Sequence, residues 1–163
     1  MKSLFSHFQK SATKGITILE IIVIISILMI LTTASVSNLS TYRSKQVLNG
    51  ESAQVLSILN KARSQTLASK SQLSYGVRIE ADRVTFYPGP TFASVPASHE
   101  EYILHHTLGI TDIALNGGGS DVLFDRLTGE APAYGTFRIS FTEDATQYHI
   151  ISISQTGFIG LQE

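Results

Sequence analysis

One apolar stretch near the N-terminus constrains this chain more than any other feature. Thirteen of the sixteen residues at positions 16–31 are Ile, Leu, Val or Met, and the exceptions are Thr17, Glu20 and Ser26. A helix of about 20 residues is long enough to cross the roughly 30 Å apolar core of a bilayer. Because one small soluble domain does not need a helix that is apolar on all faces, residues 16–35 are predicted to be a transmembrane helix.

The charges around this stretch predict its orientation. Lys2, Lys10 and Lys14 precede it without any acidic residue, and the first charges after it are Arg43 and Lys45. A short basic flank favours an N-terminus that stays in the cytoplasm, which places the rest of the chain outside the inner membrane. A secretory signal peptide cut near residues 32–35 and a plain membrane anchor are the alternatives.

Glu20 argues against both alternatives. An ionisable side chain inside an apolar span costs about 2.5 to 3.5 kcal/mol on insertion scales, so it indicates a function when a partner of opposite charge exists. The span contains no positive charge. The partner of Glu20 must therefore come from another chain or from a newly made amino terminus.

The residues around Glu20 resemble a known signature. Residues 14–20, Lys-Gly-Ile-Thr-Ile-Leu-Glu, and their apolar continuation are similar to the N-terminus of type IV prepilins, which pilins share with type II secretion pseudopilins. The resemblance implies that prepilin peptidase cuts between Gly15 and Ile16, that Ile16 is N-methylated, and that Glu20 serves filament assembly. Residues 1–15 would then be a cytoplasmic leader that is removed, and residues 16–35 the transmembrane or filament-core half of a helix.

The chain after the span divides by hydrophobic period. Residues 36–70 are predicted to be an amphipathic helix half, because Leu48, Val55, Leu59 and Ala62 recur near helical spacing. Beyond residue 70 the period becomes two, which predicts an extracytoplasmic β-sheet domain at 71–163. The predicted strands, around a loop at 88–101, are 73–80, 83–87, 102–108, 110–115, 121–124, 137–141, 148–154 and 158–161. The fold class is α+β, with one long helix packed on a mostly antiparallel sheet.

Three segments of this second part also resemble one subgroup. Residues 59–65, 122–129 and 154–159 are similar to the GspH/FimT group of minor pilins and pseudopilins. The resemblance implies a minor structural subunit of a type II secretion pseudopilus or a type IV pilus. Its partners would be other pilin or pseudopilin subunits, prepilin peptidase, a membrane assembly platform and, before assembly, the lipid bilayer.

Metal sites receive little support from the sequence. Asp112, Asp121 and Asp125 surround a glycine-rich loop and are a weak calcium candidate, although surface carboxylates explain them as well. Adjacent histidines on the predicted strand 102–108 would face opposite sides of the sheet. The histidines considered are His99, His105, His106 and His149. No cofactor or metal is therefore expected.

Catalysis is not expected either. The chain has no cysteine, and it shows no nucleophile elbow, phosphate-binding loop or paired-carboxylate motif. The protein is predicted not to be an enzyme.

The charge balance disfavours nucleic acid. Twelve basic residues stand against thirteen acidic ones, and loss of the three leader lysines leaves nine. Some FimT-like proteins bind DNA through a basic C-terminal region, but residues 139–163 contain no Lys or Arg. Lys61, Arg63 and Lys70 are read as a solvated helix face. A DNA-binding minor pilin of an uptake pilus and an unrelated membrane-anchored β-domain stay open as alternatives.

Overall fold

The structure is a computed structural model that describes residues 15–68, 70–93 and 98–162. Within this range, the side chains of residues 33–41 and of Lys70 lie outside the description. The chain forms two compact units, residues 1–42 and residues 43–163. The second unit is called the body below, and each unit is described by itself.

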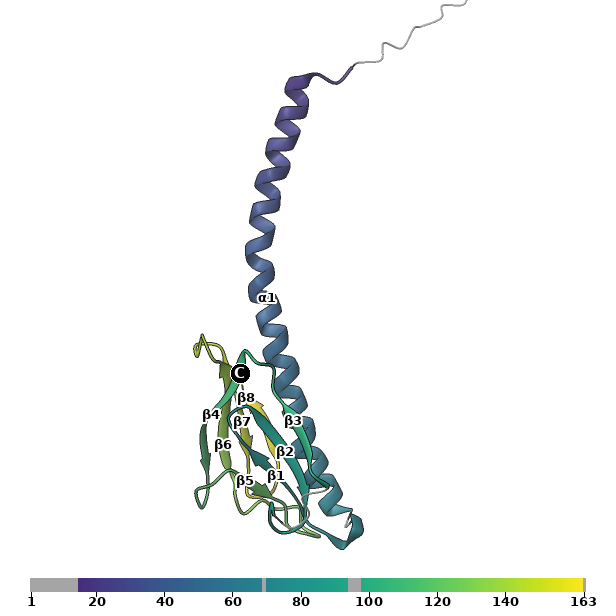
Figure 1. The fold of residues 1–163 in the computed structure, drawn as a ribbon, viewed down its shortest axis with the longest axis vertical. Helices are drawn as coiled ribbons and strands as arrows, with labels where there is room; N and C mark the ends of the chain where they lie inside the picture. The colour runs from purple at the N-terminus through teal and green to yellow at the C-terminus, as the bar shows by residue number, and fades with distance from the viewer. Residues whose placement is uncertain (1–14, 69, 94–97, 163) are drawn as a thin grey trace, which may run out of the picture. The chain divides into compact units, whose positions relative to one another are not determined.

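A single long helix dominates the first half of the chain (Figure 1). Helix α1 (Ile18–Leu67) has 50 residues and runs through Asn49 and Gly50 without a break. The two predicted helix halves, 16–35 and 36–70, form this one helix, which begins two residues later and ends three residues earlier than predicted. A short 3-10 helix, η1 (Lys70–Gln72), follows it.

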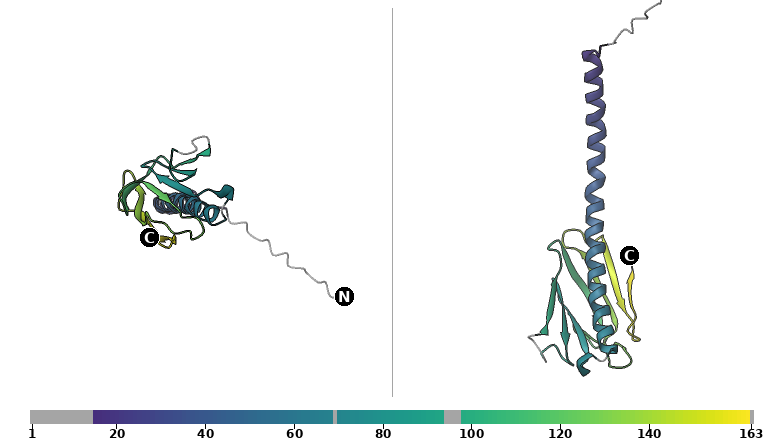
Figure 2. Two further views of the ribbon diagram at one scale, coloured as in Figure 1. Left: turned by 90° about the horizontal axis from the view of Figure 1, so that it is seen from below. Right: turned by 90° about the vertical axis from the view of Figure 1, so that its right-hand side faces the viewer.

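In the body, α1 buries one stripe of side chains. Leu48, Val55, Leu59 and Ala62 are between 0% and 3% exposed. Their spacing places them on one face of the helix, as the sequence predicted, and this face packs against the strands (Figure 2).

The strands form two sheets of four strands each. The first sheet has the order β3-β2-β1-β5, and the second has the order β4-β6-β7-β8. The strands of the first sheet are β1 (Tyr75–Ile79), β2 (Arg83–Pro88), β3 (Glu100–Ile103) and β5 (Asp121–Leu123). Those of the second are β4 (Leu108–Leu115), β6 (Gly135–Phe141), β7 (Tyr148–Ile153) and β8 (Ile159–Gln162).

Each strand pairing in the described part of the chain is antiparallel. The α+β class is therefore confirmed, but the division of the strands into two sheets was not predicted. Hydrophobic periods identify single strands, whereas the pairing of β1 with β5 joins residues more than forty positions apart. Side chains from α1 and from both sheets meet in one apolar core, with Val77, Phe124 and Ile139 among the fully buried ones.

The predicted strand 102–108 is wrong in its second half. Strand β3 ends at Ile103, and the chain turns before β4 begins at Leu108. In this turn the Leu104 N–H donates to the Asp82 carbonyl, and the Leu108 N–H donates to the His105 carbonyl. Leu104 and Leu108 are both buried and lie four positions apart, which is also the spacing of residues on one face of a strand. A strand was predicted here for that reason. The predicted loop 88–101 is shorter than expected, because Pro88 belongs to β2 and Glu100 to β3.

Candidate assembly site

The predicted cleavage site lies just before the first helical residue. Gly15, Ile16 and Thr17 are not helical, and α1 begins at Ile18. The Thr17 hydroxyl oxygen accepts a hydrogen bond from the Glu20 backbone N–H at 3.2 Å. Thr17 is therefore the N-cap of α1. The leader residues 1–14 lie outside the described part of the chain, and the cleavage and methylation sites stay predictions.

Glu20 stands in the first turn of α1, and its side chain is exposed. A carboxylate at this position interacts favourably with the positive end of the helix dipole. Thr17 and Glu20 also have the spacing of a capping box, in which Glu three residues after the N-cap supports the first turn of a helix. The sequence analysis did not use this signal. Glu20 thus has a local role in the single chain beside its predicted role in assembly.

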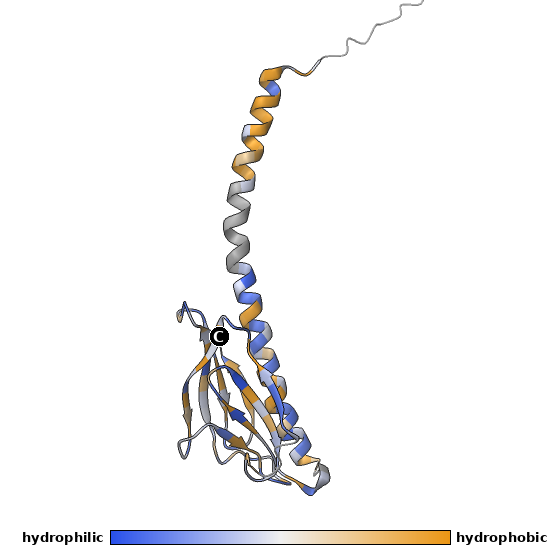
Figure 3. Ribbon diagram, viewed as in Figure 1, coloured by the Kyte–Doolittle hydropathy of each residue, from blue (hydrophilic) through white to orange (hydrophobic). Residues whose placement is uncertain are grey.

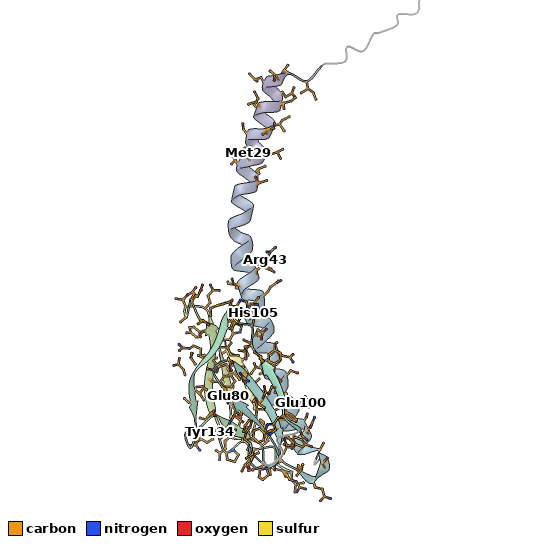
Figure 4. The ribbon with its side chains drawn as sticks, in the orientation of Figure 1. Met29, Arg43, Glu80, Glu100, His105 and Tyr134 are labelled. Carbon is orange, nitrogen blue, oxygen red and sulfur yellow. The ribbon has the colours of Figure 1, made fainter. Side chains whose placement is uncertain are left out.

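The first turns of α1 present an apolar surface on all sides. Large apolar side chains at positions 16–31 are exposed, from 47% at Ile21 to 80% at Ile18. Figure 3 shows this part of the helix in the colour of hydrophobic residues, and Figure 4 shows its side chains, Met29 among them, radiating from the ribbon. Burying one such side chain contributes about 1.5 to 3 kcal/mol, so these exposed side chains favour an apolar environment over water.

Across the residues that the structure describes, no helix has both the length and the apolar character needed to cross a membrane. The last residues of the predicted span, 33–35, lie where side chains are not described.

Two of the three aspartates of the calcium candidate pair with arginines, and Asp125 follows β5 in an exposed turn. Asp112 in β4 lies 3.0 Å from the Arg138 guanidinium. Asp121 in β5 accepts two hydrogen bonds from Arg78, at 3.1 and 2.8 Å, and this pairing raises the pKa of the arginine. The two aspartates belong to different sheets. Among the described residues, no group of three His, Asp or Glu side chains is arranged to hold a metal ion.

Four of the five histidines lie in the described part of the chain, in three different settings. His149 in β7 is buried, and its Nδ1 atom lies 3.1 Å from the Ser52 hydroxyl of α1. The His99 ring lies 4.5 Å from the Phe92 ring, measured between centroids. The expectation that His105 and His106 face opposite sides of a strand is wrong: they lie in the turn before β4, and their ring centroids are 4.3 Å apart.

The basic residues predicted to form a solvated helix face also make contacts within the body. The Lys61 ammonium pairs with the Glu100 carboxylate and lies 4.7 Å from the centre of the Phe86 ring. The Arg63 Nε atom donates to the Gly129 carbonyl at 3.3 Å. The side chain of Lys70 lies outside the description. Sequence reasoning missed these partners because Glu100 and Gly129 are distant along the chain.

Comparison with known proteins identifies the fold. No protein-family model and no curated protein sequence matches the chain. Among solved structures, the type IV minor pilin FimU of Pseudomonas aeruginosa superposes with a TM-score of 0.59. The match covers 75% of this chain and 92% of FimU at 17% sequence identity. The chain has a type IV minor pilin fold.

Two further solved structures are similar to this chain. A second crystal form of FimU gives a TM-score of 0.52 over 71% of this chain and 93% of FimU, at 17% identity. The minor pseudopilin EpsH from the type 2 secretion system of Vibrio cholerae gives 0.49 over 68% of this chain and 93% of EpsH, at 16% identity. The two superpositions on FimU confirm the type IV pilin-like, minor pilin fold that the sequence predicted.

Proposed function

We propose that this chain is a structural subunit, a minor pilin or pseudopilin, of a type IV pilus or a type II secretion pseudopilus. One observation carries the proposal. A helix whose first turns expose apolar side chains on all sides belongs to a chain with a minor pilin fold. Such a surface is suited to a lipid environment before assembly and to contacts with the helices of other subunits afterwards.

The proposed sequence of events begins in the inner membrane. The precursor is held by the apolar helix with its basic leader in the cytoplasm and its body outside. Prepilin peptidase then cuts between Gly15 and Ile16, and the new amino group of Ile16 is methylated. The non-helical conformation of residues 15–17 favours this cut, because a scissile peptide that is free of helical hydrogen bonds is easier to bind in extended form.

Glu20 gives the assembled helix its register in this proposal. The mature chain carries a positive amine at Ile16, about one turn from the Glu20 carboxylate. In a filament core with little water, the carboxylate of one subunit is stabilised by the amine of its neighbour, and a misplaced helix leaves both charges unpaired. The role is mechanical, so energy and catalysis come from other proteins of the assembly platform, and the chain itself is not an enzyme.

The mature N-terminus tests this function. The full chain is expressed with and without an active prepilin peptidase, and its N-terminal peptide is identified by mass spectrometry. We expect N-methyl-Ile16 only when the peptidase is present. A Gly15→Val variant is the matched control, because a Cβ at Gly15 meets no atom within 4 Å and so leaves the fold intact while blocking the cut. A start near residue 35, or an intact leader with active peptidase, contradicts the proposal.

The DNA-uptake alternative receives less support. The processed chain has more acidic than basic residues, and Lys61 and Arg63 are held by partners in the body. Gel shifts of the full chain across a salt series separate the two functions. Tight binding that weakens steeply with salt would favour the DNA-binding alternative.

A further inference from the structure

The tripeptide Leu-Asn-Gly occurs twice in this chain, at residues 48–50 and at residues 115–117. An asparagine that precedes glycine is especially prone to spontaneous deamidation, because glycine has no Cβ to shield its backbone nitrogen from the asparagine side chain. Both asparagines have the same neighbour on each side. The structure therefore shows how the fold treats the same local chemistry in two places.

The first copy of the tripeptide lies in the interior of a helix. Asn49 and Gly50 belong to α1, far from both of its ends, and Leu48 beside them is buried in the core. In an α-helix the Gly50 N–H donates to the Gln46 carbonyl, and the backbone angles of Asn49 are fixed. The Gly50 nitrogen can react with the Asn49 side chain only after the helix opens next to a buried leucine. The fold therefore protects Asn49.

The second copy lies in the connection between β4 and β5. Asn116 is exposed, and the glycines at 117–119 have φ angles of 89°, 64° and 151°. The Asn116 N–H donates to the Tyr134 carbonyl at 2.7 Å, whereas the Gly117 N–H has no hydrogen-bond partner among the residues that the structure describes. A Cβ placed on Gly117 would meet no atom within 4 Å. The space around the Gly117 nitrogen is therefore open.

A single hydrogen bond restrains the Asn116 side chain. Its Nδ2 atom donates to the Pro132 carbonyl at 3.1 Å, and this bond is exposed to solvent. Water can replace it while the pairing of β4 with β6 stays intact. The two asparagines therefore differ in what must open before they react. Asn116 needs the loss of one surface hydrogen bond, whereas Asn49 needs local unfolding of a helix that is packed on the core.

We propose that Asn116 is a site of spontaneous deamidation in the folded protein and that Asn49 is not. The Gly117 nitrogen attacks the side-chain amide carbon of Asn116 and gives its proton to water. The new C–N bond closes a five-membered imide ring. The bond between this carbon and the side-chain nitrogen breaks, and the nitrogen takes a proton from water and leaves as ammonia.

Water completes the reaction by adding to one carbonyl of the ring, and a ring C–N bond breaks. Opening at the side-chain carbonyl gives aspartate at position 116. Opening at the backbone carbonyl gives isoaspartate, in which the main chain continues through the side-chain carbon. In sum, one water is consumed, one ammonia is released, and a neutral amide becomes a carboxylate.

Deamidation removes a link between two connections of the body. A carboxylate at position 116 has no N–H to donate to the Pro132 carbonyl, and two acceptor oxygens at such a distance repel each other. Isoaspartate also lengthens the backbone next to Leu115, which pairs with Gly135 where β4 meets β6. We expect this end of the two strands to open more often in the modified chain. The site lies in the body, and it does not depend on the proposed function.

The rates of deamidation in the unchanged sequence test the proposal. The purified full chain is incubated in detergent at neutral pH, and peptide mass spectrometry follows the appearance of a carboxylate at each asparagine. We expect Asn116 to react about tenfold faster than Asn49, or more, because opening a helix is rarer than opening a surface loop. Equal rates, or a faster reaction at Asn49, overturn the proposal.

The same measurement in urea separates the fold from the sequence. In the unfolded chain both tripeptides are open to water, so we expect the two rates to agree within about twofold. A preference for Asn116 as large in urea as in buffer would come from the local sequence, in which Gly118 stands where the first copy has Glu51. That result would overturn the assignment to the fold.

An Asn116→Asp chain tests the consequence of the reaction. Hydrogen exchange of the backbone N–H groups at residues 131–135 should be about threefold faster than in the unchanged chain, or more, because the link to Pro132 is lost. Asn49→Asp is the matched control, because Asn49 is exposed on α1 and the same change of charge there should leave this exchange as it was. Equal exchange in the two variants overturns the predicted opening.

Discussion

The Ser52 hydroxyl of α1 lies 3.1 Å from the Nδ1 atom of His149 in β7, and both side chains are buried. This polar pair joins the helix to the second sheet inside a core that is otherwise largely apolar. Folding removes both groups from water, and burying either one without a hydrogen-bond partner costs free energy. The pair therefore favours the one position of the helix on the strands in which the two groups meet.

Replacing Ser52 should therefore destabilise the body. Ser52→Ala leaves the His149 ring nitrogen buried without its partner, which we expect to lower the free energy of unfolding by about 1–3 kcal/mol. Urea unfolding of the full chain in detergent, followed by tyrosine fluorescence, measures this change. Ser57→Ala is the matched control, because Ser57 lies on the exposed face of the same helix and its replacement should change stability by less than about 0.5 kcal/mol.

The close approach of Gly157 to Gly129 predicts an unequal cost of adding a methyl group at two glycines. Gly118→Ala introduces a left-handed alanine in open space, since φ is +64° and nothing lies within 4 Å, and should cost about 1–2 kcal/mol. Gly157→Ala has a similar φ of +76° but also drives a Cβ to 1.9 Å from the Gly129 oxygen. Thermal unfolding should show a clearly larger loss of stability for Gly157→Ala than for Gly118→Ala. Equal losses would contradict the predicted clash with the Gly129 oxygen.

The hydrogen bond of Tyr102 should make the free energy of unfolding fall at alkaline pH. Its hydroxyl donates to the Glu51 carboxylate at 2.8 Å, and burial, together with this carboxylate, raises the pKa of Tyr102 to about 12. Since an unfolded tyrosine has a pKa of about 10, the folded chain holds this proton more tightly. The resulting stabilisation is complete below pH 10 and is lost as the pH rises through 12.

Tyrosinate absorbance checks this titration. Burial also raises the pKa of Tyr87 to about 12, so two phenols should ionise late. Tyr102→Phe should remove one late step, and Glu51→Gln should move that step toward lower pH. A titration in which Tyr102→Phe removes an early step would refute the assignment.

Replacing Glu20 should affect membrane insertion and filament assembly in opposite ways. Glu20→Ala should insert into membranes at least as well as the unchanged chain, because it removes a charge that is costly in an apolar span. The same change should sharply reduce incorporation into filaments, measured in sheared pilus or pseudopilus fractions. Thr17→Ala, which removes the N-cap but not the carboxylate, is the control for a merely local effect on the helix. Normal incorporation of Glu20→Ala would show that Glu20 does not set the register.

Calcium is expected to have little effect on stability. Asp112 and Asp121 are paired with arginines on separate sheets, and a bound ion would have to displace both. Neither millimolar calcium nor a chelator should change the unfolding temperature. A rise that Asp121→Asn abolishes would establish a calcium site.

The sequence predicted the elements of this fold better than their arrangement. The buried stripe of α1 from Leu48 to Ala62 and the inward face of β1 follow from the hydrophobic period, and the first turns of α1 follow from the length of the apolar run. The turn after β3 was missed because Leu104 and Leu108 are both buried and evenly spaced. For the same reason, His105 and His106 were expected to face opposite sides of a strand.

Features that depend only on neighbouring residues could be predicted from the sequence. The apolar stretch, its flanking charges and the Glu20 position lie within about twenty residues, and they lead to the pilin-like expectation without any tertiary contact. Contacts between distant groups are visible only in the folded chain, and they include Ser52 with His149, Arg63 with Gly129, and Gly129 with Gly157. Such contacts depend on strand pairing and on core packing, which bring together residues that no local pattern links.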